Sequence, residues 1–142
     1  MKVVGVMLSE EIKKGLVDII NERVNSSFIL LFGSYAKGTA REDSDIDLGY
    51  YAVELLSSYE RFILAGELAQ VAKREIDLVN IREVDTVFAM QIFSTGQLLS
   101  CRDENEFLKQ RMKAFSMYIN LNQQRAEVLQ SIQERGSVFG DE

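Results

Sequence analysis

Helical and strand-like patterns of apolar residues follow one another along the chain. In the helical segments apolar residues recur every three or four positions, whereas the strand-like segments are short continuous apolar runs. Ser57 precedes Glu60 by three residues, which is the capping-box pattern that opens a helix. The predicted segments are a helix over 9–24, a strand over 27–32, a turn or single helical turn over 34–43, a strand over 45–52, a helix over 57–73, a strand over 76–81, a helix over 85–95 ended by Gly96, a short extended piece over 97–100 and a helix over 103–134.

This order of segments predicts an α/β (α+β) fold, with a small mixed β-sheet flanked by helices and a long C-terminal helix. The chain has 142 residues, of which 46% are apolar and 27% charged, as is usual for a globular protein. We therefore expect a single domain over residues 1–142.

The last predicted helix carries more apolar residues than a small sheet needs to be covered. One of two stripes is expected to pack on the domain, and the excess predicts a docking surface for a partner or a second copy. The first stripe is Leu108, Met112, Phe115, Ile119, Ala126 and Leu129, and the second is Phe107, Tyr118, Leu121, Val128 and Ile132.

Composition narrows the possible chemistry. The chain has no histidine and a single cysteine, Cys101, which excludes histidine bases, imidazole zinc sites and an internal disulfide. We expect Cys101 to be a buried small hydrophobe in a reducing compartment. No apolar run approaches the ~20 residues of a membrane span or resembles a signal peptide, so we expect a cytoplasmic protein. The net charge of −6 makes nucleic acid an unfavourable partner.

Three aspartates are the candidate metal ligands. Asp45 and Asp47 are two positions apart in a predicted strand, so their side chains should leave the same face and repel unless a cation lies between them. Asp77, inside another apolar strand, is the expected third ligand and the best candidate general base, with Glu75 or Glu83 as alternatives for the ligand. Mg²⁺ suits such a carboxylate set.

A Gly33-Ser34 turn after the first strand is the candidate phosphate site. Glycine allows close approach of the backbone, and the Ser34 hydroxyl and the following amides can donate to phosphate oxygens. Gly33 and Gly38 have the glycine spacing of a Walker A loop, but Thr39 stands where that loop has lysine, so this motif is rejected.

Gly33-Ser34, ten residues and then Asp45-Ile46-Asp47 resemble the G-S-x₁₀-D-x-D pattern of the polymerase-beta-like nucleotidyltransferase superfamily. The chain most resembles the minimal nucleotidyltransferase (MNT) antitoxins of HEPN/MNT toxin–antitoxin systems, over about residues 27–81. Lys37 departs from the family, in which arginine is more common at this position.

The resemblance implies a nucleotidyltransferase fold in which Gly33 and Ser34 bind ATP and Asp45, Asp47 and Asp77 bind Mg²⁺, two ions in all, and carry catalysis. It implies a type VII-like antitoxin that transfers AMP from ATP to a tyrosine of its cognate HEPN ribonuclease toxin, with a hetero-oligomer formed through the C-terminal helix. Two alternatives stay open: a non-catalytic antitoxin that masks the toxin, and a small-molecule nucleotidyltransferase.

Overall fold

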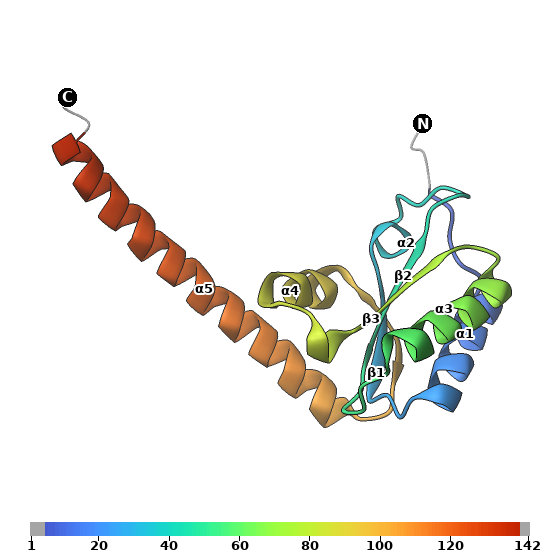
Figure 1. The fold of residues 1–142 in the computed structure, drawn as a ribbon. Helices are drawn as coiled ribbons and strands as arrows, with labels where there is room; N and C mark the ends of the chain where they lie inside the picture. Colours follow the sequence, from blue (N-terminus) through green and yellow to red (C-terminus); the bar gives the residue numbers. More distant parts are fainter. Residues whose placement is uncertain (1–4, 140–142) are drawn as a thin grey trace.

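A mixed β-sheet forms the centre of the computed structural model, which describes residues 5–139 (Figure 1). Within that range the sheet has four strands in the order β3-β2-β1-β4. β1 is antiparallel to both β2 and β4, whereas β2 and β3 are parallel. The strands are β1 (Phe28–Phe32), β2 (Ile46–Tyr51), β3 (Ile76–Asn80) and β4 (Gln97–Cys101).

Side-chain caps begin the helices where the sequence predicts them. Ser9 accepts a hydrogen bond from the Ile12 amide, Ser57 forms the complete capping box with Glu60, and Asp85 accepts from the Phe88 amide. Each cap satisfies an amide that the first helical turn leaves unpaired. The helices are α1 (Glu10–Arg23), α2 (Ser34–Lys37), α3 (Ser58–Ala72), the 3₁₀ turn η1 (Ile81–Glu83), α4 (Thr86–Thr95) and α5 (Glu104–Phe139).

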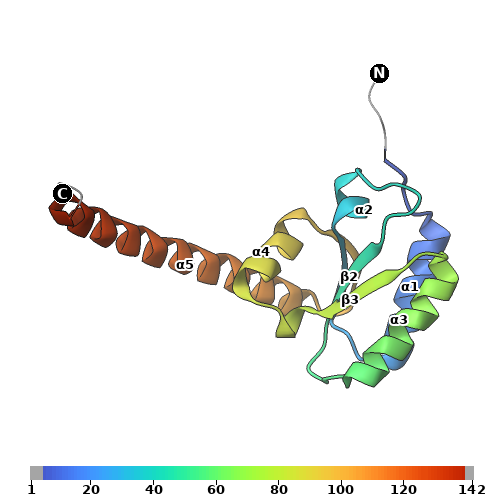
Figure 2. The ribbon, with the colours of Figure 1, turned by 45° about the horizontal axis from the view of Figure 1, so that its top comes forward.

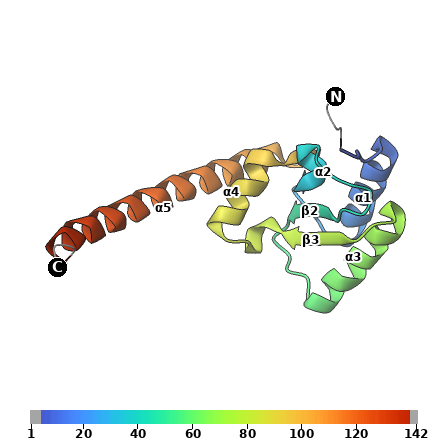
Figure 3. The same cartoon turned by 90° about the horizontal axis from the view of Figure 1, so that it is seen from above.

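The two faces of the sheet are covered by different helices (Figures 2 and 3). On one face α1 and α3 pack over alternate residues of the central strands, including the fully buried Ile46, Leu48 and Tyr50 of β2. On the other face α4 and the start of α5 pack over residues such as Phe28 and Tyr51. The intervening residues of β2, among them Asp47, therefore face the side of α4 and α5.

Helix α5 continues far beyond the sheet (Figure 1). Its 36 residues correspond to about 54 Å of helix, but only its first part packs on the domain, through Phe107, Ala114 and Phe115. Farther along, Ile119 and Leu129 are 55% and 62% exposed. The predicted surplus of apolar surface on this helix is therefore present.

Most predicted segments agree with the structure to within a residue or two, and the mixed sheet with a long C-terminal helix is confirmed. Two expectations were wrong. The last helix does not stop near residue 134 but passes through Gly136, since one glycine costs a helix only about 1 kcal/mol. Cys101 is exposed rather than buried, because it ends an outer strand. No helix in the described range has the length and apolarity to cross a bilayer.

Candidate active site

The turn after β1 brings the backbone against an aspartate. Gly33 has φ +71°, and a Cβ atom at this residue would lie 2.0 Å from Oδ2 of Asp47. Both the positive φ and the close approach exclude a side chain here. Because Phe32 pairs with Asp47 across β1 and β2, the sheet register itself sets this contact.

The single-turn helix α2 starts directly after Gly33. The amides of Ala36 and Lys37 donate to the Gly33 carbonyl, and Gly38 ends the turn with φ +77°. Ser34, the second predicted phosphate contact, is the first residue of this turn. The arrangement places the Ser34 hydroxyl and the first amides of α2 beside the end of β1, as a phosphate-binding turn requires.

Asp47 and Asp77 lie side by side on neighbouring strands. They are register partners in the parallel pairing of β2 with β3, so both side chains leave the same face of the sheet. Burial, the negative charge of Asp77 and, to a smaller extent, the charge of Asp45 together raise the pKa of Asp47 to about 6. Near neutral pH the pair therefore carries repelling charges that a cation would relieve.

Asp77 is exposed, although its neighbours along the strand are apolar. The reason is the position of β3 at the edge of the sheet, where one side of the strand is open. Its neighbours Ile76 and Leu78 point to the face covered by α3, which explains the apolar pattern around it.

Asp45 lies just before β2 and not inside it. The chain turns over residues 41–44, where the Ser44 amide donates to the Arg41 carbonyl, and strand pairing begins at Ile46. Both neighbours raise the pKa of Asp47 through their negative charge, and Asp77 does so more strongly than Asp45. The predicted trio is thus a close pair with a third carboxylate near the pair.

The carboxylates of this site are suitable ligands for a divalent cation. Among the side chains described in residues 5–133, no three from aspartate, glutamate, histidine or cysteine converge closely enough to hold an ion on their own. Mg²⁺ is commonly held by one or two carboxylates, with water and substrate phosphates completing its shell. Asp47 and Asp77 can provide such a pair, and Asp45 can add charge.

Two residues that sequence reasoning passed over hold the loop before Asp45. The Tyr35 hydroxyl donates to the Arg41 carbonyl at 3.2 Å, and Arg74 Nε donates to the Glu42 carbonyl at 3.2 Å. The Arg74 guanidinium also lies 5.7 Å from the centre of the Tyr35 ring. The only signal in the sequence was Arg74, which shortly precedes the strand that carries Asp77. An arginine at that position does not by itself indicate a contact with the loop before Asp45.

The fold and the paired carboxylates beside a glycine turn are those of a nucleotidyltransferase. A family model described as "Polymerase beta, Nucleotidyltransferase" matches residues 14–105, and the chain belongs to this family. The chain is 34% identical to protein adenylyltransferase MntA of Shewanella oneidensis over 105 residues, which are 73% of this chain and 74% of that protein. The predicted resemblance to the minimal nucleotidyltransferases is confirmed.

Solved structures give the same result. A chain of a toxin–antitoxin complex crystallised with AMP-PNP is similar with a TM-score of 0.76 and 28% identity, over 89% of this chain and 99% of that one. A chain of the MntA–HepT toxin–antitoxin structure has a TM-score of 0.72 at 24% identity, over 88% of this chain and 99% of that one. The second likeness is a likeness of fold alone.

Proposed function

We propose that this chain is a cytoplasmic antitoxin that transfers AMP from ATP to a tyrosine of a cognate HEPN toxin. The tyrosine oxygen forms a bond to the α-phosphorus, the bond from that phosphorus to the diphosphate breaks, and diphosphate leaves. The observation that carries the proposal is the contact of the Gly33 turn with Asp47, which is itself paired with Asp77. The similarity to an adenylyltransferase and to a chain from a complex with an ATP analogue supports it.

Each site residue has a role in this proposal. Gly33 and Ser34 bind the triphosphate through the amides of the turn and the Ser34 hydroxyl. Asp77 is exposed beside Asp47 and so can take the proton of the incoming hydroxyl. We assign Asp45, Asp47 and Asp77 to hold Mg²⁺, two ions in the complete site. When bound, Mg²⁺ supplies positive charge to the phosphate oxygens.

Isotope position tests the reaction. The purified chain is incubated with Mg²⁺, its HEPN partner and ATP labelled at either the α- or the γ-phosphate. Label from the α-phosphate should appear on the partner, and mass spectrometry should place AMP on a tyrosine. Label from the γ-phosphate alone would identify a kinase and refute the proposed transfer.

The exposed apolar residues of α5 favour a second function, neutralisation by masking the toxin. Ile119, Val128 and Leu129 are each more than half exposed, so this helix can bind a partner without any chemistry. Expression of Asp47→Asn together with the toxin distinguishes the two mechanisms. Growth arrest shows that AMP transfer is required, and normal growth at native expression shows that masking suffices.

A further inference from the structure

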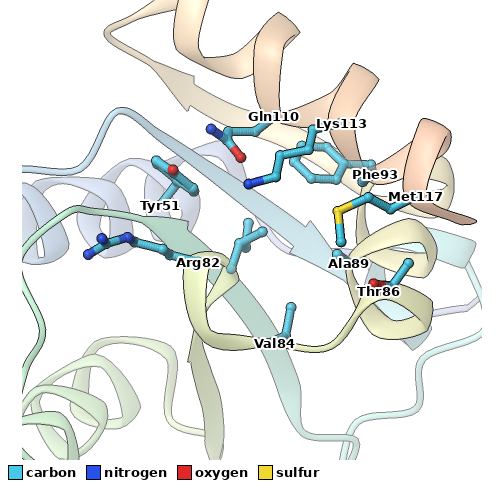
Figure 4. Close-up of a pocket in the computed structure, with 11 residues that line it drawn as sticks. Tyr51, Arg82, Val84, Thr86, Ala89, Phe93, Gln110, Lys113 and Met117 are labelled. Carbon is cyan, nitrogen blue, oxygen red and sulfur yellow. The ribbon is translucent and has the colours of Figure 1, made fainter.

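A pocket separate from the three aspartates lies between α4, α5 and η1 (Figure 4). Its volume is about 310 Å³, and its floor is apolar, with Ile81 and Phe93 from the core of this face. Gln110, Lys113 and Met117 reach it from α5, opposite Arg82 and Tyr51 (Figure 4). Such a volume accommodates one large apolar side chain together with a short polar group.

The charged side chains that line this pocket are basic. Among the described residues that line it, Arg82 and Lys113 are charged and none is acidic, although the whole chain has a net charge of −6. Neither cation forms a salt bridge with any side chain described in residues 5–133. Arg82 donates to the Val53 carbonyl at 2.6 Å, and the nearby Glu106 accepts from Gln110 at 3.0 Å. Lys113 is therefore free to meet an anionic group.

The pocket shares a sheet face with the aspartates. Asp47, Gly49 and Tyr51 leave β2 on that face at steps of about 7 Å. Ile81, which lines the pocket, lies against Gly49, since a Cβ atom there would be 3.0 Å from Ile81 Cδ1. The pocket therefore begins near Gly49, two residues along β2 from Asp47, on the side away from the Gly33 turn.

In the proposed reaction, the acceptor enters from that side. In an in-line displacement the attacking hydroxyl and the leaving diphosphate lie on opposite sides of the phosphorus. If the Gly33-Ser34 turn holds the diphosphate, the hydroxyl arrives from the direction of Gly49 and Tyr51. The adenosine part of ATP is uncharged, so cations at this pocket favour an acidic acceptor segment over the nucleoside.

We propose that this pocket anchors the acceptor protein by taking an apolar side chain with a neighbouring aspartate or glutamate, which pairs with Lys113 and Arg82. The inference rests on the proposed function, because the HEPN toxin is the acceptor protein. The anchor holds the segment that carries the acceptor hydroxyl close to Asp47 and Asp77.

Binding of the purified HEPN toxin without nucleotide tests the anchor directly. Lys113→Glu should raise the Kd for toxin by about tenfold or more, because it places like charges opposite each other. Lys113→Arg keeps the charge and should bind within about twofold of wild type. Lys109→Glu is the matched control, since it is exposed on the same helix but outside the pocket, and it should also stay within about twofold.

Kinetics gives a second readout. Ala89→Phe should fill the pocket and, like Lys113→Glu, raise KM for the toxin while KM for ATP and kcat at saturating toxin stay unchanged. Should Ala89→Phe fail to fold by circular dichroism, Lys113→Glu decides. Wild-type toxin binding by Lys113→Glu, an equal loss in Lys109→Glu, or weakened ATP binding in Lys113→Glu would each overturn the anchor.

The two proposals fail in different ways. If the wild-type chain binds the toxin but transfers no AMP, the proposed reaction is wrong and the binding series still decides the pocket. If the wild-type chain does not bind the toxin at all, both proposals are overturned.

Discussion

Replacing Asp47 by asparagine should make the metal-free protein more stable at neutral and alkaline pH. Burial and the charges of Asp77 and Asp45 raise the pKa of Asp47 from 3.8 to about 6, so the ionised carboxylate is disfavoured in the folded state. A carboxyl group whose pKa is higher in the folded than in the unfolded state does not lower the free energy of unfolding while the pH is below its unfolded-state pKa. Stability is then lost as the pH rises through the folded pKa. Asparagine has the same shape without the charge.

The size of the effect follows from the shift. At about 1.4 kcal/mol per pKa unit the upper limit is ~3 kcal/mol at pH 8. Asp47 is only partly buried and solvent screens its charge, so we expect about 1–2 kcal/mol, or roughly 4–8 °C in Tm for a chain of this size. The advantage of the variant should shrink by more than half between pH 8 and pH 4.5, because the wild-type carboxyl becomes protonated over that range.

Thermal and urea unfolding in EDTA at both pH values would measure this difference. Asp18→Asn is the matched control, because Asp18 is an exposed carboxylate on α1 and its substitution should change stability by less than ~0.5 kcal/mol. Addition of Mg²⁺ and ATP should reverse the order, since only the wild-type site gains binding energy. A variant less stable than wild type at pH 8, or a difference independent of pH, would refute the reasoning.

Two further predictions concern the turn and the long helix. Gly33→Ala should abolish AMP transfer because its Cβ displaces Asp47. Gly38→Ala is the control: it has a similar positive φ but no atom within 4 Å of the new Cβ, so it should lose only ~1–2 kcal/mol of stability and keep most activity. Equal activities of the two variants would contradict this prediction. The double variant Tyr118→Ala/Leu121→Ala should lose toxin binding in a pull-down but keep its nucleotide affinity, measured by calorimetry. The reason is that both side chains lie on α5 beyond its contact with the sheet. If the variant unfolds instead, these side chains belong to the core.

Local signals in the sequence predicted most of the fold. Ser57 and Asp85 begin helices through contacts only three residues away, which a sequence pattern can reveal. The Gly33-Ser34 turn and the start of β2 were likewise predictable, because strand ends and glycine turns have local signatures. The direction of β3 and its register with β2 depend on pairing across about 30 residues, and no local pattern determines them.

The same limit applies to the candidate site. Asp47 and Asp77 were predicted to share a site, and their register pairing agrees with that, but the exposure of Asp77 follows from the edge position of β3. The pocket around Lys113 and Arg82 could not be predicted, since α4, α5 and η1 meet there only in the folded chain. Sequence spacing shows which residues share an element, not which elements enclose a cavity.

The strand order also has a consequence for how the chain folds. β1 and β2 form an antiparallel pair, so the Gly33 turn and Asp47 can meet early, through contacts close in sequence. Asp77 joins only after α3 has formed the crossover that returns β3 parallel to β2. A chain emerging from the ribosome would therefore assemble the Gly33 turn first and bring Asp77 beside Asp47 later. Substitutions that slow the docking of α3 should delay the appearance of activity more than the formation of the β1–β2 hairpin.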